Sequence, residues 1–570
     1  MSLLEVTDLC VSYGEDIVLQ DVSFSIDAGD AIGLVGESGS GKSQTALAIL
    51  GLLPRSATVS GSVRFAGEEL LGASTAALNL VRARRIAMVF QDPMQALNPY
   101  VRIGKQLRRI LISHGLASGA AADERVMQML RRVGLADAER QFHAYPHQLS
   151  GGMRQRVMIA SALIAEPDLL IADEATTALD VTVQAQILAL LDELRNETAL
   201  LMITHDLGVV AGFCERMLVV QHGIVVEQGA TLAVFSAPQH EHTRTLLQTA
   251  ARLDSAVALP VASGRAVLTV DNASVSYRQP GRGALHAVKE ASLSLNEGET
   301  LAIVGESGSG KSSLVRGLLG LVPLECNTFV FDGERRDIQM VFQDPAGSLD
   351  PQMRVEGIVE EPLRVHAAQL GRAERRERVV DILGAVGLDE TFLRRYPHQL
   401  SGGQAQRVAI ARALLLKPRV LVCDEAVAAL DGSVRHRILE LLRQLQEKMG
   451  LSIIFIAHDL AVVRSISHRI VVMYLGRVVE VADNASLFNR PQHPYTKALL
   501  DAVPVPDPTS GHTPTPLVGE IPSAFTPPSG CAFHPRCPEA IAQCSAAVPE
   551  LRAVNGSKAA CIRINVPVAE

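Results

Sequence analysis

Two identical eight-residue segments have the composition of a loop that binds phosphate. GESGSGKS occurs at residues 36–43 and again at residues 305–312. Each follows one apolar run and precedes another, which predicts a strand before the loop and a helix after it. Glycine lets backbone N–H groups close around phosphate oxygens, and the helix N-terminus adds partial positive charge. A single match could be a chance glycine-rich turn, but two matches in this context favour nucleotide-binding loops in which Lys42 and Lys311 reach the β- and γ-phosphates.

Groups suited to Mg²⁺ accompany each loop. Ser43 and Ser312 follow the lysines and can offer a hydroxyl to the ion. LLIADE and VLVCDE read as buried strands that end in an aspartate. Asp173 can thus join Ser43 at one ion, and Asp424 can join Ser312 at the other. The other residues expected to line the loops are Gly36, Ser38, Gly39 and Gly41 in the first copy and Gly305, Ser307, Gly308 and Gly310 in the second.

The residue after each of these aspartates is a glutamate. Glu174 and Glu425 point differently from the aspartates, because side chains alternate along a strand. Each is placed to polarise the water that attacks the γ-phosphate. The alternative is a strand that ends in solvated acids, and the nearby phosphate loop disfavours it.

The whole arrangement is duplicated. The segments around the loops, FQDP, YPHQLSGG, the acidic strands and HDL all recur in the same order. Equivalent lysines are 269 positions apart but equivalent glutamines, Gln91 and Gln343, only 252, so the second copy lacks about 17 residues of a peripheral antiparallel lobe. We therefore expect domains at 1–250 and 267–495, a linker at 251–266, and a Pro-rich, four-cysteine region at 496–570.

Composition limits the class of protein. The chain has 570 residues, 48% of them hydrophobic, and a net charge of −8, which disfavours a strongly basic nucleic-acid-binding surface. We find no apolar run of the roughly 18 residues needed to span a bilayer. The first residues also lack the pattern of a secretory signal. These observations predict a cytosolic chain whose membrane role, if any, comes through a partner.

LSGGMRQR and LSGGQAQR resemble the signature motif of the ABC-type ATPases. The resemblance implies an α/β fold of two tandem P-loop NTPase domains, each a RecA-like core with a helical lobe (about 100–165 and 353–415) and an antiparallel β lobe, followed by an irregular cysteine-containing tail. It also implies that two domains sandwich ATP between the phosphate loop of one and the signature of the other. One expected site pairs Lys42, Ser43, Gln91, Asp173, Glu174 and His205 with Ser401, Gly402 and Gly403. The other pairs Lys311, Ser312, Gln343, Asp424, Glu425 and His458 with Ser150, Gly151 and Gly152.

The resemblance assigns further roles. His205 and His458 match the switch histidine that contacts the γ-phosphate, and Gln91 and Gln343 match the Q-loop glutamine near Mg²⁺ and the membrane partner. Asp180 and Asp431 close the D-loops, and Tyr13 and Tyr277 match the aromatic that stacks on adenine, an exposed or core-packed tyrosine being the alternative. Neither copy is degenerate, so we predict two sites that hydrolyse ATP.

Three kinds of ABC protein lack a fused membrane channel: the energising subunit of an importer, the soluble tandem ATPase that acts on ribosomes, and the DNA-repair ATPase. A soluble tandem ATPase acting on ribosomes usually has a long charged linker, but the linker at 251–266 is short. A DNA-repair ATPase has large zinc-bearing insertions, for which the two domains leave no room. RPQHPYTKALL (490–500) and GCAFHPRCPEAIAQC (530–544) instead resemble the oligopeptide/dipeptide/nickel importer family. We therefore expect an energising subunit on the cytoplasmic face of the membrane, with two transmembrane permease subunits, an extracytoplasmic solute-binding protein and no nucleic acid. The solute stays open among dipeptide, oligopeptide, glutathione, nickel chelate and haem.

Four of the eight cysteines crowd into the last 40 residues: Cys531, Cys537, Cys544 and Cys561. Four thiolates suit a [4Fe–4S] cluster or a tetrahedral Zn²⁺, and free thiols are the third possibility. Zinc sites usually contain C-x₂₋₄-C pairs, which this spacing lacks. Members of the importer family hold an iron–sulfur cluster in the same tail, so the resemblance favours the cluster, in a structural role.

Overall fold

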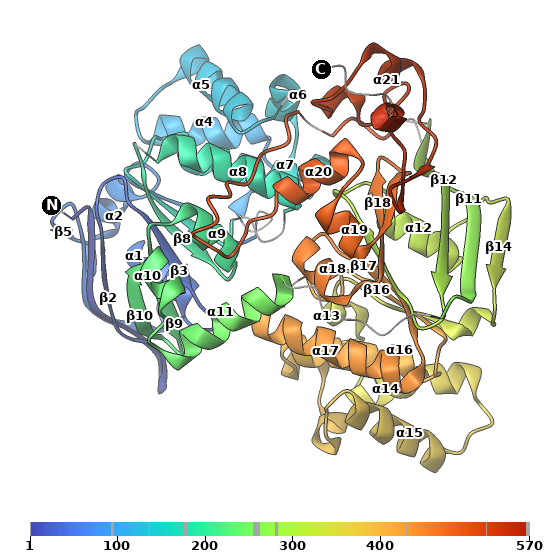
Figure 1. Ribbon diagram of the computed structural model, residues 1–570. Coiled ribbons are helices and arrows are strands. Elements are labelled where there is room, and N and C mark those ends of the chain that lie inside the picture. Colours follow the sequence, from blue (N-terminus) through green and yellow to red (C-terminus); the bar gives the residue numbers. More distant parts are fainter. Residues whose placement is uncertain are drawn as a thin grey trace. The chain divides into compact units, whose positions relative to one another are not determined.

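The structure is a computed structural model that describes residues 2–92, 96–135, 137–175, 179–195, 197–254, 263–279, 283–428, 430–519 and 521–565. The chain forms two compact units (Figure 1). The first contains Met1–Ala251 and Ala502–Glu520, and the second contains Arg252–Asp501 and Ile521–Glu570. Half of the linker expected at 251–266, residues 255–262, lies outside the described residues.

The first unit is built on two sheets. The strands of its antiparallel sheet, in spatial order, are β2 (Asp16–Ile26), β1 (Leu4–Tyr13), β4 (Ala57–Phe65) and β5 (Glu68–Glu69). The larger sheet runs β10 (Ile224–Ala230), β9 (Arg216–Gln221), β3 (Ala31–Val35), β8 (Ala199–Thr204), β7 (Leu169–Asp173) and β6 (Ile86–Val89). All neighbours in this order are parallel except the antiparallel pair β10–β9.

The helices of the first unit cover the larger sheet and form a separate lobe. They are α1 (Lys42–Ile49), α2 (Thr75–Val81), α4 (Ile103–Ser113), α5 (Gly119–Arg132), α6 (Ala138–His143), α7 (Gly151–Leu163), α8 (Val181–Leu194), α9 (Leu207–Phe213), α10 (Thr231–Ser236) and α11 (Glu241–Asp254). The helical lobe expected at about 100–165 contains α4 to α7, which lie together in Figure 1.

The second unit repeats this plan with a smaller antiparallel sheet. That sheet runs β12 (Gly283–Asn296), β11 (Ala266–Gln279) and β14 (Thr328–Phe331). The main sheet runs β15 (Ile338–Val341), β16 (Val420–Asp424), β17 (Ser452–Ile456), β13 (Thr300–Val304), β18 (Arg469–Tyr474), β19 (Arg477–Asp483), β21 (Ser557–Ala559) and β20 (Arg552–Val554). Among the described residues, the second unit has no counterpart of β5 and α2, in the stretch where the sequence is shorter.

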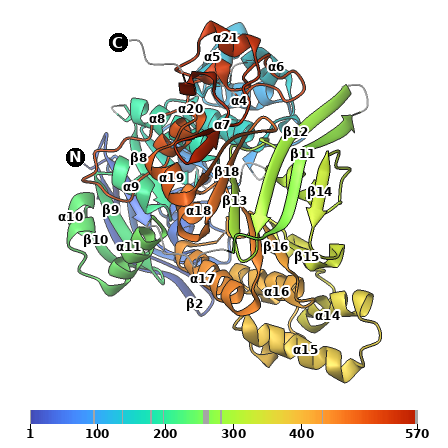
Figure 2. The same cartoon turned by 45° about the vertical axis from the view of Figure 1, so that its right-hand side comes forward.

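The helices of the second unit include a lobe matching that of the first. They are α12 (Lys311–Leu318), α13 (Pro345–Ser348), α14 (Val355–His366), α15 (Arg372–Ala385), α16 (Gly402–Leu414), α17 (Gly432–Met449), α18 (Leu460–Ile466), α19 (Asn484–Asn489), α20 (Pro494–Asp501) and α21 (Ala542–Ala546). In Figures 1 and 2, α14 and α15 lie together at one end of this unit, beyond α16.

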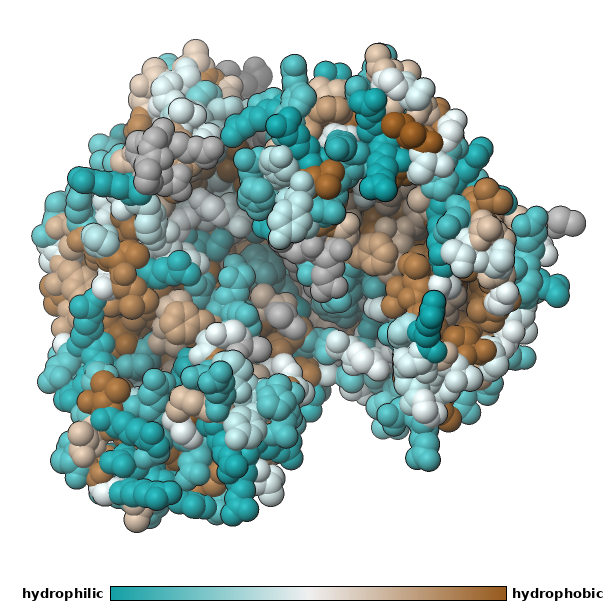
Figure 3. Space-filling model, turned by 180° about the vertical axis from the view of Figure 1, so that it is seen from behind, coloured by the Kyte–Doolittle hydropathy of each residue, from teal (hydrophilic) through white to brown (hydrophobic). Residues whose placement is uncertain are grey.

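Each parallel sheet is buried on both faces, as its apolar strands predict. In β7, Leu170 and Ala172 belong to one hydrophobic cluster, which includes the helical lobe, whereas Leu169 and Ile171 belong to the cluster beneath the antiparallel sheet. On the face shown in Figure 3, hydrophobic side chains form separate patches between hydrophilic ones. Within the described parts of the chain, we find no helix that is long and apolar enough to cross a membrane.

The tail is more ordered than its sequence suggests. Residues 502–520 pack on the first unit, where the Gln186 side chain donates a hydrogen bond to the Leu517 carbonyl oxygen and the Pro504 backbone lies against Gly208. The chain then returns to the second unit, where the hairpin β20–β21 extends the main sheet through β19. The expectation of an irregular tail was wrong for this hairpin, because strands of three residues are too short to show an alternating pattern.

Candidate functional site

The sheet order brings the predicted catalytic residues to one edge in each unit. In the first unit β3, β8, β7 and β6 are parallel neighbours, so their carboxyl ends lie side by side. The phosphate loop follows β3, Gln91 follows β6, Glu174 follows β7 and His205 follows β8. The order β13, β17, β16 and β15 gives the second unit the same arrangement. Binding sites of open α/β sheets lie at this edge.

Both phosphate loops have the same tight backbone. Gly41 and Gly310 adopt φ values of 101° and 102° just before their helices, a conformation that favours glycine. A Cβ at Gly310 would lie 2.3 Å from the Ala287 carbonyl oxygen, so a larger residue would push the loop outward. The other predicted loop residues, Gly36, Ser38, Gly39, Gly305, Ser307 and Gly308, lie in the same turns between strand and helix.

The loop lysines are buried and contact their own loops. Lys42 Nζ donates to the carbonyl oxygens of Gly36 at 2.9 Å and Glu37 at 2.8 Å. Lys311 Nζ makes the equivalent bonds to Gly305 at 2.7 Å and Glu306 at 3.0 Å. The ammonium group thus lies at the centre of each loop, where a phosphate would replace the carbonyl groups as its partner.

A hydroxyl and a carboxylate meet beside each loop. Ser43 Oγ donates to Asp173 at 3.1 Å, and Ser312 Oγ donates to Asp424 at 3.0 Å. Serine and aspartate oxygens are ligands that Mg²⁺ prefers, and the ion usually keeps several of its waters. The residues present therefore fit a magnesium ion bound together with the phosphates.

The expected base lies between the glutamine and the histidine. Gln91 Nε2 donates to Glu174 at 2.7 Å, and His205 Nδ1 lies 3.3 Å from the other carboxylate oxygen of Glu174. In the second unit Gln343 donates to Glu425 at 2.6 Å, and His458 Nδ1 lies 3.8 Å from the Glu425 carboxylate. A glutamate held in this way can orient a water molecule and accept its proton.

The backbone of both glutamates is strained. Glu174 has φ 47° and Glu425 has φ 48°, which places both in the left-handed region that side chains other than glycine seldom adopt. Such a conformation costs about 1–3 kcal/mol and persists only where the surroundings hold it. Here each amide donates to the adjacent strand, to Ile203 at 2.8 Å and to Ile456 at 3.0 Å. The left-handed conformation turns each side chain away from the alternating pattern of the strand, and its carboxylate then accepts a hydrogen bond from the glutamine.

The two carboxylates of each pair differ in acidity. Burial raises the pKa of Glu174, but the hydrogen bond with His205 and the nearby positive charges outweigh it and lower the pKa below the ordinary value. The pKa of Glu425 is lowered too, chiefly by its hydrogen bond with His458. Burial raises the pKa of Asp173 to about 6 and also raises that of Asp424. Each glutamate is therefore ionised and ready to act as a base.

Asp173→Asn is expected to stabilise the Mg²⁺- and nucleotide-free protein at about pH 8, by on the order of 2 kcal/mol. The folded pKa of Asp173 lies above its unfolded value, so folding favours the protonated form. The free energy of unfolding of the wild-type protein therefore falls as pH rises through about 6, because the buried carboxyl group ionises, and that of the variant does not. Thermal unfolding between about pH 4 and pH 8 measures the difference, which should shrink towards the acidic end. An equal unfolding temperature at about pH 8 would contradict it.

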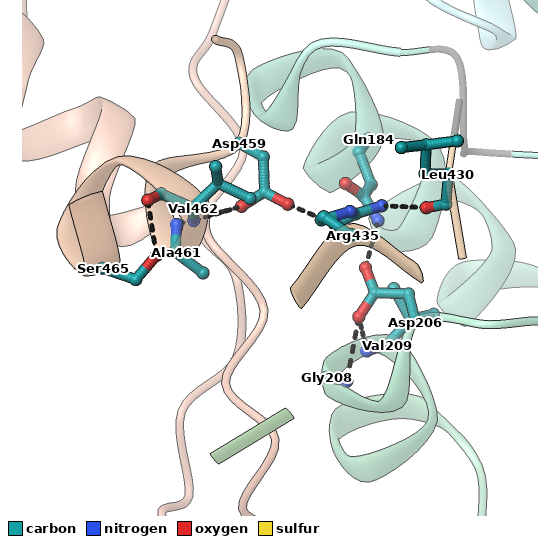
Figure 4. Close-up of polar contacts among 10 residues, drawn as sticks. All are labelled: Gln184, Asp206, Gly208, Val209, Leu430, Arg435, Asp459, Ala461, Val462 and Ser465. Atoms are coloured by element: carbon teal, nitrogen blue, oxygen red, sulfur yellow. Dashed lines mark hydrogen bonds and ion pairs between the residues drawn. The ribbon is translucent and has the colours of Figure 1, made fainter. Parts of the chain in front are cut away.

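The residue after each switch histidine also has a structural task (Figure 4). Asp206 accepts hydrogen bonds from backbone N–H groups in the first turn of α9 and from the Gln184 side chain at 3.2 Å. Asp459 caps α18 in the same way and accepts from the Arg435 guanidinium at 2.7 Å. Neither aspartate was predicted from the sequence to have a role, although ITHDL and IAHDL repeat both. They fix the turn that carries the histidine.

The signature serines begin helices. Ser150 is the N-cap of α7 and accepts from the Met153 N–H, and Ser401 is the N-cap of α16 and accepts from the Gln404 N–H. Gly151, Gly152, Gly402 and Gly403 form the first turns of these helices. Both serines are exposed. An exposed helix N-terminus presents N–H groups and partial positive charge to an anion.

The D-loop aspartates and the predicted adenine-stacking tyrosines lie at element ends. Asp180 is the N-cap of α8, and Asp431 is the N-cap of α17. Tyr13 ends β1, is half-buried, and donates to Gln44 at 2.8 Å. Tyr277 in β11 is also half-buried and donates to Ser313 at 3.3 Å. Each tyrosine hydroxyl thus contacts the helix that follows its own phosphate loop.

The four tail cysteines line one small cavity in the second unit, together with His493, Phe533 and His534 among others. Burial raises the pKa of the thiols of Cys531 and Cys561, and that of Cys537 to about 11, so without a cation these thiols keep their protons. Among the described residues, no group of three or more histidine, cysteine or acidic side chains is arranged to hold a metal ion. The structure thus places the four cysteines around one cavity but does not arrange them as ligands of a metal ion.

Two complete sets of P-loop lysine, Mg²⁺-binding pair and ionised glutamate define a nucleoside triphosphatase with tandem P-loop domains. Residues 19–177 and 288–428 match the ABC transporter family, and residues 479–544 match the C-terminal region of oligopeptide/dipeptide transporters. The chain belongs to the ABC transporter family, and it binds and hydrolyses ATP with Mg²⁺ to energise a transporter. Nothing in these comparisons supports the ribosomal alternative.

Individual relatives cover nearly the whole chain. It is 42% identical to the glutathione import ATP-binding protein GsiA of Pectobacterium atrosepticum, over 91% of this chain and 93% of that protein. Identity to the protein of the same name in Escherichia coli (strain K12) is also 42%, over 89% and 90%. Among solved structures, cbiO1 from Clostridium perfringens, part of the ABC transporter complex cbiONQ, is 31% identical over 40% of this chain and 92% of cbiO1, with a TM-score of 0.36.

Proposed function

We propose that this chain energises a membrane importer of small peptides, with glutathione or a di- or oligopeptide as the solute. The observation that carries the proposal is that both units contain a full catalytic set ahead of a tail matching the oligopeptide/dipeptide transporter region. The relatives named for glutathione import support it, and glutathione is itself a tripeptide. The chain would lie on the cytoplasmic face of the membrane as a peripheral subunit, and no role in nucleic-acid binding is proposed.

We propose that ATP is bound at two composite sites. The signature helices α7 and α16 are buried along most of their length but begin at exposed serines, Ser150 and Ser401, and such N-termini can bind a terminal phosphate. Each would contact the ATP held by the phosphate loop of the other domain. Ser401, Gly402 and Gly403 would complete the site of Lys42, and Ser150, Gly151 and Gly152 would complete the site of Lys311. ATP then joins the domains, and hydrolysis releases them.

A groove in the second unit suits a membrane partner. Its volume is about 770 Å³, and Phe342, Gln343, Val365 and Asp424 are among the residues that line it. Val365 and Phe342 are exposed apolar side chains, which are suited to receive a short helix of a permease subunit. Gln343 lies in this groove and also donates to Glu425, so a partner that moves Gln343 would disturb the catalytic base. We propose two permease subunits, supplied by an extracytoplasmic solute-binding protein.

The test is reconstitution of the chain with its permease subunits and binding protein in lipid vesicles. Glutathione or a dipeptide should raise ATP hydrolysis several-fold and should accumulate inside the vesicles. Val365→Asp should lower this stimulation much more than the basal rate, because Val365 is an exposed apolar residue of the groove and is not one of the catalytic residues. Co-purification with ribosomes, or hydrolysis that no peptide-like solute stimulates, would overturn the proposal.

We also propose that the tail cysteines hold a [4Fe–4S] cluster, with Zn²⁺ as the alternative. The support is that Cys531, Cys537, Cys544 and Cys561 line one cavity, so that four thiols are available as donors for either group, although they are not arranged as metal ligands. When bound, such a group cross-links segments of the tail that have little hydrophobic core of their own. Arg563 helps hold these segments together, since its guanidinium donates to the Glu539 carbonyl oxygen at 3.0 Å.

A further inference from the structure

A buried ion pair joins the tail to the second phosphate loop. Arg536 Nη1 and Nη2 donate to the two carboxylate oxygens of Glu306 at 2.7 and 3.0 Å. Glu306 is the residue after the first glycine of GESGSGKS, and Arg536 lies just before Cys537. The side chains are only 3% and 2% exposed, so the pair is removed from water. A bidentate pair of this kind fixes both the position and the orientation of its carboxylate.

An aromatic cluster surrounds the pair. The rings of Tyr474, Tyr495 and Phe533 lie 4.7 to 5.3 Å apart, and Arg536 also donates to the Tyr474 hydroxyl at 3.4 Å. The backbone N–H of Glu306 donates to the Tyr495 hydroxyl at 2.9 Å. Together with the bond from Lys311 to its carbonyl oxygen, these contacts hold Glu306 from three sides. The tail and α20 therefore shape the loop that must wrap the phosphates.

The first phosphate loop has the same sequence in different surroundings. Glu37, the counterpart of Glu306, is half-buried rather than buried. It lies near His242, the counterpart of Tyr495; burial lowers the pKa of His242, and the negative charge of Glu37 acts in the opposite direction. Gln221 stands where the second unit has Tyr474. The two phosphate loops thus have the same sequence motif, but different side chains pack against them.

We infer that Arg536 is a positioning residue for nucleotide binding at the second phosphate loop, so the C-terminal region makes the two ATP sites inequivalent. Arg536 is buried and paired with Glu306, so it acts on the loop through that residue, whose backbone carbonyl is one of the groups that hold Lys311. A loop that is held before ATP arrives needs less ordering when it binds. Loss of the arginine leaves a buried carboxylate without its cation, which favours a shifted loop.

The test isolates each site in the full-length chain. Lys42→Ala leaves the second site to be measured, and Lys311→Ala leaves the first. In the Lys42→Ala background, Arg536→Lys should raise the dissociation constant for a fluorescent ATP analogue with Mg²⁺ by about tenfold, because lysine cannot donate the bidentate pair. In the Lys311→Ala background the same change should leave the first-site constant within about twofold. Arg552→Lys in the Lys42→Ala background is the matched control: Arg552 is an exposed tail arginine outside both phosphate loops, so its change should leave the second-site constant within about twofold.

A second variant covers the case in which Arg536→Lys unfolds the protein. Glu306→Gln with Arg536→Gln removes both charges and keeps polar groups of similar size, a change that folded proteins tolerate better than removal of one partner. It should fold and still weaken binding at the second site. A role confined to stability would lower the unfolding temperature and leave second-site affinity unchanged in both variants. That result, or equal weakening at the two sites, would overturn the inference.

Discussion

Glu174→Gln combined with Glu425→Gln is expected to lower ATP turnover by about 100-fold or more, because the two changes remove both general bases, and either single change should remove the turnover of its own site. Each glutamate is ionised, has a left-handed backbone, and accepts a hydrogen bond from its glutamine. Glutamine keeps the hydrogen-bonding shape but cannot accept the proton of water. Steady-state hydrolysis with Mg²⁺ measures turnover, and equilibrium binding should show that affinity for ATP is kept.

Glu193→Gln is the control for these variants. Glu193 is an exposed carboxylate on α8, away from the catalytic cluster, so its loss should leave turnover within about twofold. The two single variants test the symmetry of the sites as well. If either of them hydrolysed ATP at the wild-type rate, the interpretation of two competent sites would be wrong for that unit.

The proposed cluster predicts about four iron and four sulfide ions per chain, and Cys531→Ser combined with Cys544→Ser is expected to abolish this iron binding. Two of the four thiols around the cavity are lost in this variant. Metal and sulfide analysis of anaerobically purified protein measures the effect. Cys326→Ser is the matched control, because Cys326 is an exposed thiol outside the cavity. One tightly bound zinc per chain, or no metal at all, would contradict the cluster.

Much of the site could be predicted from the sequence because its parts are local motifs at strand ends. Strand, loop and helix around Lys42 form one continuous segment, and parallel pairing then brings Asp173 and His205 to the same edge. The shortened second β lobe could be predicted too, since the spacing of repeated residues counts what is missing. In these cases the signal lies in adjacent residues or in the comparison of two copies.

The rest depends on contacts that no local pattern contains. The left-handed backbone of Glu174 follows from packing against the next strand, and glutamate has no preference for it. The Glu306–Arg536 pair joins residues 230 positions apart, at a loop position where the motif permits any residue. The Pro-rich segment at 502–520 has no periodicity, so its packing on the first unit could not be read from hydropathy.

The long separation between Glu306 and Arg536 also matters while the protein is being made. A ribosome adds about 5–20 residues per second, so the arginine emerges roughly 10–50 s after the glutamate it neutralises. During that interval the nascent second domain contains Glu306 without the arginine that pairs with it. Co-translational folding should therefore form the first phosphate loop well before the second, which gains its full set of contacts only when Arg536 has left the exit tunnel.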